Sequence, residues 1–355
     1  MNVLVAMSGG VDSSVAAALL QREGHDVVGV TLKLWGGPSD QGCCSVSDVE
    51  DARRVADHLG IEHHVFNFSE DFEAAVVAPY VTAHARGQTP NPCISCNRYL
   101  KFDRLVGRAR ALGFDAVATG HHARIVSADS ASPRPPALRL ARGADAAKDQ
   151  SYVLYMLDQP TLGYVMFPVG SRSKAEVRAL ARDLGLRTAD KPDSQEVCFI
   201  SAQGAAGSGR QRFLAERMQL TPGRVIDTDG RQVGQVASVQ LVTIGQRKGL
   251  GLEGGSEPQF VLDVDVAAAT VTVGSRAELA RDQVALTDLR WAGEPEEGPV
   301  LAQASAHGEA RPARLEGSVL HWEDPYRRVA PGQVIVFYRV HPTLGEVVLG
   351  GGTAT

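Results

Sequence analysis

The chain has 355 residues, 44% of them hydrophobic, and a formal net charge of −5. This length permits two or three domains with buried cores, and the negative charge excludes a whole-molecule field that attracts nucleic acid. The sequence has no apolar run long enough for a membrane span and no N-terminal signal-peptide pattern. We therefore expect a soluble, cytoplasmic protein with no membrane partner.

Strands and helices are predicted to alternate through the first half of the chain. Short valine-rich runs indicate buried strands, and apolar residues at helical spacing indicate amphipathic helices. The predicted strands are 2–7, 26–32, 62–68 and 114–122, and the predicted helices are 12–23, 46–60, 96–113 and 173–189. Such alternation is typical of parallel βαβ units, so we expect an α/β domain built on a parallel sheet.

The amino-acid composition changes after residues 201–210, which are rich in small residues and resemble a flexible linker. Residues 127–137 also have the composition of an exposed loop. Downstream, short valine-rich runs separated by Gly, Asp and Pro dominate, as in 223–234, 260–274 and 333–340. These runs predict a β-rich second half made of small barrels.

Residues 3–20 place a glycine loop between a predicted strand and a predicted helix. Gly9 and Gly10 expose backbone N–H groups there, and the helix dipole adds partial positive charge, so the loop suits an anion. The loop lacks the lysine of a Walker A motif and the glycine spacing of a dinucleotide fingerprint. Ala6 also stands where a nucleophile elbow needs its first glycine. The loop is therefore interpreted as a phosphate loop of another kind.

Five cysteines, an odd number, argue against a framework of structural disulfides. They are Cys43, Cys44, Cys93, Cys96 and Cys198. Cys96 is expected near the start of the helix at 96–113, beside basic side chains, which should make its thiol more acidic and more nucleophilic. Cys43 and Cys44 are adjacent and are interpreted as incidental.

The residues Ser8 to Ser13, Ser-Gly-Gly-Val-Asp-Ser, resemble the pyrophosphate loop (PP-loop) of the ATP-pyrophosphatase superfamily, which cuts ATP between its α and β phosphates. Further stretches follow the order of one family across nearly the whole chain. They are AMSGGVDSSVAA, TPNPCISCN, ATGHHAR, KDQSYVLY, KPDSQEVCFI, TIGQRKGLGL and PGQVIVFY. On these motifs the chain resembles the tRNA-specific 2-thiouridylases.

The resemblance implies an adenine-nucleotide α-hydrolase-like (PP-loop) domain at 1–200, a small central β-rich domain at 201–275 and a tRNA-binding β-barrel at 276–355. It implies a sulfurtransferase that uses ATP and Mg²⁺ to adenylate the C2 oxygen of the wobble uridine (position 34). Cys198 would carry the incoming sulfur as a persulfide, and Cys96 would be the nucleophile that completes transfer by forming a disulfide. The implied partners are a tRNA with uridine at the wobble position and a persulfide donor or relay protein.

The resemblance also implies two sets of binding residues. The ATP pocket would comprise Ala6, Met7, Ser8, Gly9, Gly10, Val11, Asp12, Ser13, Leu32 and Gly120, with Asp12 helping to place Mg²⁺. The tRNA contacts would be Asn91, Pro92, Cys93, His121, Lys148, Asp149, Gln150, Ser305, Ala306 and Gln333. Ser305 and Ala306 stand where relatives often carry an Arg-Tyr pair, and Arg327 and Arg328 are expected to compensate. Basic runs at 98–110 and 172–191 are candidate RNA patches, although a solvated helix face is the simpler interpretation.

Three alternatives stay open. Cys93 stands where many relatives have Asp, and with Cys96 and Cys198 it supplies three thiolates, enough for an iron–sulfur cluster with one open iron site. A second alternative is another PP-loop synthetase that adenylates a small carboxylate or carbonyl. The paired cysteines disfavour it, because amine donors need no thiol relay. A third is an RNA-binding protein with a relic nucleotide site.

Overall fold

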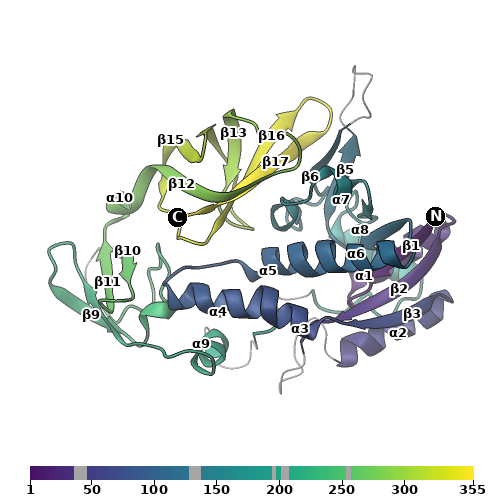
Figure 1. Ribbon diagram of the computed structural model, residues 1–355, viewed down its shortest axis with the longest axis horizontal. Coiled ribbons are helices and arrows are strands. Elements are labelled where there is room, and N and C mark those ends of the chain that lie inside the picture. The colour runs from purple at the N-terminus through teal and green to yellow at the C-terminus, as the bar shows by residue number, and fades with distance from the viewer. Residues whose placement is uncertain (36–45, 128–136, 194–196, 201–207, 253–256) are drawn as a thin grey trace.

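The computed structural model describes residues 1–35, 46–127, 137–193, 197–200, 208–252 and 257–355, which form three parts (Figure 1). The N-terminal segments form an α/β part, the middle segments a small sheet, and the C-terminal segments a β-barrel. Cys43, Cys44 and most of the predicted loop and linker lie outside the described residues. Within those residues, no helix is both long and apolar enough to cross a membrane.

The N-terminal part is built on a five-stranded parallel sheet in the order β3-β2-β1-β4-β7. The strands are β1 (Asn2–Ala6), β2 (Asp26–Lys33), β3 (Glu62–Asn67), β4 (Ala116–Thr119) and β7 (Val165–Met166). The predicted parallel sheet is confirmed, and only β7 was missed, because two residues carry no periodicity. Since β1 and β4 are parallel neighbours, the loops at their carboxyl ends lie together.

Helices cover both faces of this sheet. They are α1 (Val11–Arg22), α2 (Val46–Leu59), α3 (Ser69–Phe72), the π-helix η1 (Glu73–Val77), α4 (Ala78–Ala85), α5 (Pro92–Ser95), the π-helix η2 (Cys96–Arg104), α6 (Leu105–Ala111), the 3-10 helix η3 (Ser151–Leu154), α7 (Gln159–Leu162) and α8 (Lys174–Asp183). Side chains alternate along β1, so Val3 and Val5 pack with α1, α2 and α8, whereas Leu4 packs with α4 and α6. The sheet is therefore a buried platform for the loops at its strand ends.

The central part is a four-stranded sheet in the order β10-β11-β8-β9. Its elements are α9 (Ser208–Ala215), β8 (Gly223–Ile226), β9 (Gln232–Val236), the 3-10 helix η4 (Val239–Leu241), β10 (Phe260–Asp265), β11 (Thr270–Gly274) and α10 (Arg276–Leu279). Val225, Val261 and Val271 are fully buried in its core. The predicted β-rich central part is confirmed.

The C-terminal part is a closed barrel, because β12 pairs with both β15 and β17. Its strands are β12 (Ala280–Trp291), β13 (Gly298–Gln303), β14 (Arg311–Glu316), β15 (Val319–Arg327), β16 (Val334–His341) and β17 (Gly345–Ala354). Leu315, Leu320 and Phe337 are fully buried in its interior. The predicted C-terminal β-barrel is confirmed.

A hairpin from the N-terminal part extends the barrel sheet. Its strands, β5 (Ala123–Ser127) and β6 (Leu138–Arg142), pair with each other. Ala141 of β6 also pairs with Val347 of β17. The N-terminal part and the barrel therefore share one hydrogen-bonded sheet, which the sequence did not predict.

Candidate active site

The glycine loop follows β1 at the carboxyl edge of the sheet and leads into α1. Gly9 has φ +73°, and a side-chain carbon there would lie 2.3 Å from the carbonyl oxygen of Asp48, so this position requires glycine. Gly10 is the N-cap of α1, and the Ser13 hydroxyl donates to its carbonyl at 3.1 Å. The same hydroxyl accepts from the Ser8 N–H at 3.2 Å. The Ser8 hydroxyl lies 3.4 Å from that of Ser13, so two hydroxyls and a helix N-terminus converge on one turn, as a phosphate site requires.

Gly120 brings the end of β4 against this loop. A side-chain carbon at Gly120 would lie 2.5 Å from the backbone nitrogen of Ser13 and 2.6 Å from the carbonyl carbon of Asp12. The structure therefore brings the two predicted ATP-binding segments together. The side chains of three predicted ATP-binding residues, Met7, Val11 and Leu32, are buried in the core. A fourth, Ala6, is the last residue of β1.

We expect Gly120→Ala to weaken ATP binding at least about tenfold, because the added methyl group meets backbone that no side-chain rotation can move. Calorimetric titration with ATP and Mg²⁺ measures the change. Gly107→Ala in α6 is the matched control, since a side-chain carbon there meets nothing within 4 Å. Equal affinity of Gly120→Ala and the unchanged protein would contradict this account of the pocket.

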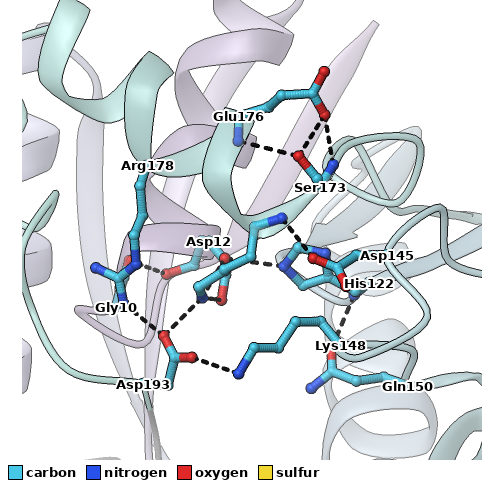
Figure 2. A network of polar contacts seen from close by, with 12 residues as sticks. Gly10, Asp12, His122, Asp145, Lys148, Gln150, Ser173, Glu176, Arg178 and Asp193 are labelled. Atoms are coloured by element: carbon cyan, nitrogen blue, oxygen red, sulfur yellow. Dashed lines mark hydrogen bonds and ion pairs between the residues drawn. The ribbon is translucent and has the colours of Figure 1, made fainter.

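Asp12, in the first turn of α1, is the centre of a polar network beside the loop (Figure 2). Its two carboxylate oxygens accept from the ammonium group of Lys174 at 2.8 and 2.7 Å. One of them also lies 3.1 Å from Nε2 of the buried His122. Lys174 extends the network, because its ammonium group lies 3.0 Å from Asp193.

Asp193 is held by three cationic side chains. Besides Lys174, it contacts Lys148 at 2.9 Å and Arg178 at 2.7 Å. Burial by itself raises the pKa of the Asp193 carboxyl, but the hydrogen bonds from Lys148 and Lys174 outweigh burial and hold the pKa well below its usual range. Burial likewise raises the pKa of Asp12, and its hydrogen-bonding partners more than reverse that effect. Both carboxylates are therefore ionised at neutral pH.

The helix that carries Cys93 and Cys96 begins earlier than predicted. α5 starts at Pro92, and the Asn91 side chain caps it by accepting from the Cys93 N–H at 3.0 Å. Cys93 therefore lies in the first turn, and the prediction that Cys96 begins this helix is wrong. Cys96 instead begins the π-helical segment η2, a wider coil that is frequent at functional sites.

Cys198 is positioned by the residues on either side of it. Val197 has φ +53°, a strained conformation for a β-branched residue. Phe199 is 5% exposed and anchors the segment in a cluster of aromatic rings. The rings around it are Trp35, Phe72, Tyr80 and Phe213.

The two cysteine segments pack in one hydrophobic core. Ile94, next to Cys93, is buried there together with Tyr80. Tyr80 in turn stacks edge-on against Phe199, with ring centroids 5.6 Å apart. Cys96 and Cys198 are both half-buried and pack against one hydrophobic core.

We expect Phe199→Ala to lower the free energy of unfolding by about 3–5 kcal/mol, because it empties the centre of this cluster. Phe66→Ala serves as the comparison, since Phe66 is only partly buried, and its loss should be smaller. Urea unfolding followed by circular dichroism measures both. Equal losses in the two variants would show that Phe199 is not the anchor of the segment.

Comparisons with known proteins cover the chain from end to end. The tRNA methyl transferase HUP domain family matches residues 1–202, the tRNA methyl transferase PRC-barrel domain 211–275 and the aminomethyltransferase beta-barrel domain 281–354. The tRNA-specific 2-thiouridylase MnmA of Roseiflexus castenholzii is 47% identical over 99% of this chain and 98% of its own length. The chain belongs to the family of tRNA-specific 2-thiouridylases.

Two further members of the thiouridylase family show the same extent of similarity. MnmA of Carboxydothermus hydrogenoformans is 44% identical over 99% of this chain and 96% of its own length. MnmA of Mycobacterium avium is 45% identical over 99% of this chain and 98% of its own length. The family predicted from the motifs, and with it the enzyme class of PP-loop tRNA sulfurtransferases, is confirmed.

Of the residues that the thiouridylase resemblance assigns to tRNA, Lys148, Asp149 and Gln150 contact the protein itself. Lys148 belongs to the network described above. The Asp149 side chain is 6% exposed and accepts from Arg142 at 2.8 Å. The Gln150 side chain accepts from the backbone N–H of His122 at 2.9 Å. This segment therefore connects the polar network around Asp12 to Arg142.

Arg142 joins this segment to the barrel. Besides Asp149, its guanidinium donates to Gln303 at 2.9 Å and bonds to Glu346. It also stacks 4.0 Å over the ring of Tyr338. A single side chain thus contacts the segment beside the glycine loop and three residues of the barrel.

The three candidate tRNA residues in the barrel, Ser305, Ala306 and Gln333, also form hydrogen bonds within the protein. The backbone carbonyls of Ser305 and Ala306 accept from the buried Gln303 at 2.9 and 3.1 Å. The Gln333 side chain donates to the carbonyl of Thr89, in the loop that precedes α5. Gln333 therefore connects the barrel to the turn that carries the predicted base contacts.

His121 is buried, at 8% exposure. Its Nδ1 lies 2.6 Å from the hydroxyl of Thr119, and its Nε2 lies 3.5 Å from the ammonium group of Lys101. Burial lowers its pKa far below the usual histidine value, and the nearby Lys101 acts in the same direction. Its ring is therefore neutral and contributes no charge toward an RNA phosphate.

The two basic runs are largely engaged in ion pairs. Besides the pairs of Lys174 and Arg178, these are Arg98–Asp288, Arg104–Asp71, Arg182–Asp190, Arg187–Asp51 and Lys191–Asp48. Arg328, expected to compensate in RNA binding, donates to Asp263 and to the Leu262 carbonyl of the central sheet. These cations therefore already have partners within the protein.

The iron–sulfur alternative needs three thiolates grouped around one site. Within the described residues, no three His, Cys, Asp or Glu side chains are grouped so that they could hold a metal ion. Magnesium fits differently, because it binds through one or two carboxylates together with substrate phosphates. Asp12 is a carboxylate of this kind beside the loop.

Sequence reasoning did not assign four residues of the network. They are His122, Lys174, Arg178 and Asp193. Each lay in a stretch that the sequence singled out, since His122 belongs to ATGHHAR, Asp193 to KPDSQEVCFI, and the other two to a basic run. The sequence could not show which side chain each of these residues contacts, because those contacts depend on the fold.

Proposed function

We propose that this chain 2-thiolates the wobble uridine of tRNA in the cytoplasm, with ATP as the activating substrate. The observation that carries the proposal is the glycine loop packed against Gly120, with two cysteine segments packed in one hydrophobic core. The similarity to 2-thiouridylases over 99% of the chain supports the same reaction.

The first step is adenylation of the base. The uridine C2 oxygen attacks the α phosphorus of ATP and the N3 proton is lost. The bond from the α phosphorus to the bridging oxygen breaks, and pyrophosphate leaves with the electron pair. Ser8, Ser13 and the N-terminus of α1 stabilise the charge that develops on pyrophosphate. Asp12 would help to hold the Mg²⁺ that accompanies the phosphates.

The second step is sulfur transfer. The terminal sulfur of a Cys198 persulfide attacks C2, and AMP leaves, so that the nucleoside is joined to Cys198 through a disulfide. The Cys96 thiolate then attacks Sγ of Cys198, which forms a Cys96–Cys198 disulfide and releases 2-thiouridine. A thiol reductant restores both cysteines, and a persulfide donor reloads Cys198.

The tRNA is proposed to lie across the barrel and the N-terminal part, with the target base flipped toward Asn91, Pro92 and Cys93. The capped turn at Asn91 is tied to the barrel through Gln333, which supports a base pocket that forms between the two parts. Lys148 is the most exposed cation of the network and is proposed to meet a tRNA phosphate.

Two of the matching families are described as tRNA methyl transferase domains, whereas the full-length relatives are named thiouridylases. Methyl transfer needs neither cleavage of ATP at the α phosphate nor a pair of thiols. The PP-loop and the two cysteine segments therefore favour thiolation.

The experiment measures release of AMP and pyrophosphate from ATP and Mg²⁺ with two transcripts of one tRNA, which carry either uridine or cytidine at the wobble position. We expect release only with uridine. Equal release with both transcripts, or release without tRNA, would indicate a small-molecule synthetase. Tight tRNA binding without any release, when a persulfide donor is present, would indicate an RNA-binding protein.

A further inference from the structure

Asp193 places a negative charge where the nucleotide's phosphates are expected. It is bound by Lys174 and Arg178 of α8 and by Lys148. The side chains of Lys174 and Arg178 are only 12% and 23% exposed, so their interactions with Asp193 are shielded from water. Figure 2 shows Asp193 beside Asp12 of the glycine loop.

The ammonium group of Lys174 is fully engaged in this arrangement. It has three N–H donors, and its contacts are two oxygens of Asp12 and one oxygen of Asp193. A phosphate that approaches Lys174 must therefore replace one of these oxygens. Asp12 belongs to the first turn of α1 and is fixed with the loop, so Asp193 is the group that can leave.

We propose that the Asp193 carboxylate occupies the place of the terminal phosphates of ATP, and that bound nucleotide displaces it from Lys174 and Arg178. The inference rests on the proposed function, because it requires ATP on the glycine loop. A phosphate chain carries more negative charge and more acceptor oxygens than a carboxylate, so these cations prefer it. Displacement also releases Lys148 for contact with RNA.

Asp193 and Cys198 belong to the same stretch of the chain, five residues apart in the sequence. Val197, next to Cys198, has φ +53°, a strained conformation for a β-branched residue. Displacement of Asp193 by the nucleotide is therefore expected to change the reactivity of the Cys198 thiol.

The first test compares Asp193→Asn with Asp190→Asn in the full-length protein. Asp190 is the matched control, because it pairs with Arg182 of the same helix at 2.8 Å. The titrants are α,β-methylene-ATP with Mg²⁺, which cannot be cut between its α and β phosphates, and AMP. We expect Asp193→Asn to bind the ATP analogue about three- to tenfold more tightly and AMP as before. Asp190→Asn should bind both as the unchanged protein does.

Weaker binding of the analogue by Asp193→Asn would overturn the proposal, because Asp193 would then be a ligand of the nucleotide or its Mg²⁺. Equal tightening for AMP would also overturn it, because AMP lacks the terminal phosphates.

The second test is the rate at which iodoacetamide alkylates Cys198, followed by peptide mass spectrometry with Cys96 as internal reference. In the unchanged protein the ATP analogue should accelerate labelling of Cys198, and AMP should not. Asp193→Asn should label at the accelerated rate without nucleotide. A rate that is insensitive to the analogue would overturn the proposal. Neither test uses tRNA, so if both succeed while tRNA-dependent AMP formation fails, the proposed function falls and the Asp193 inference stands.

Discussion

Cys198→Ser is expected to abolish 2-thiouridine formation, by at least about 10³-fold, while pyrophosphate release in a single turnover stays within about twofold of normal. A serine hydroxyl cannot carry a persulfide, but it leaves the glycine loop and Asp12 unchanged. AMP should stay on the base in this variant, because only the attacking sulfur displaces it. The measurement combines mass spectrometry of digested tRNA with counting of labelled pyrophosphate. Loss of pyrophosphate release together with thiolation would contradict the assignment of adenylation to the glycine loop and of sulfur transfer to Cys198.

Cys93→Ser is the matched control for this result. The mechanism proposed for Cys96 and Cys198 leaves no essential role to Cys93, so this variant should keep most of its thiolation. A cluster held by three thiolates would instead lose activity equally in all three serine variants. Cys96→Ser should trap the tRNA on Cys198 as an adduct that dithiothreitol releases.

Lys174→Ala is expected to lower AMP formation by about 10²- to 10³-fold at saturating ATP. The reason is the loss of one buried hydrogen-bond donor to the charge that develops on pyrophosphate. The variant also removes the main cation beside Asp12, so the ionised carboxylate would repel the phosphates. Single-turnover AMP release measures the effect, and thermal melting reports on folding.

Arg182→Ala is the matched control for Lys174→Ala, because Arg182 lies on the same helix and pairs with the exposed Asp190. Its AMP formation should stay within about twofold of normal, since exposed ion pairs contribute little. If Lys174→Ala raises only the KM for ATP and leaves kcat intact, Lys174 binds substrate without assisting the chemical step.

The sequence correctly predicted those parts of the site that are formed by one continuous stretch of chain. The loop from Ser8 to Ser13 carries its own glycines, strand and helix, so its geometry follows from local sequence. Asn91 and Pro92 also carried a local signal, since Asn caps helices and Pro favours their first position. These two residues indicate a helix that begins at Pro92, as the structure shows, rather than at Cys96.

The parts that the sequence could not predict depend on contacts between distant residues. Lys174 meets Asp12 across 162 positions, and Lys191 meets Asp48 across 143. Periodicity says which face of a helix is polar, but it does not say which charge lies opposite. The basic run at 172–191 was therefore recognised by composition, while its acidic partners beside the glycine loop came from the fold.

The strand pairing between β6 and β17 has a consequence for how the chain is made. Ala141 meets Val347 only after the last part of the protein has left the ribosome. The intervening residues, about 200 of them, need about 10 to 40 s of synthesis at the usual rate. During that interval the edge of β6 has no β17 to pair with, although the α/β part is already complete enough to fold. Translation thus leaves this sheet edge exposed to other strands until the barrel arrives.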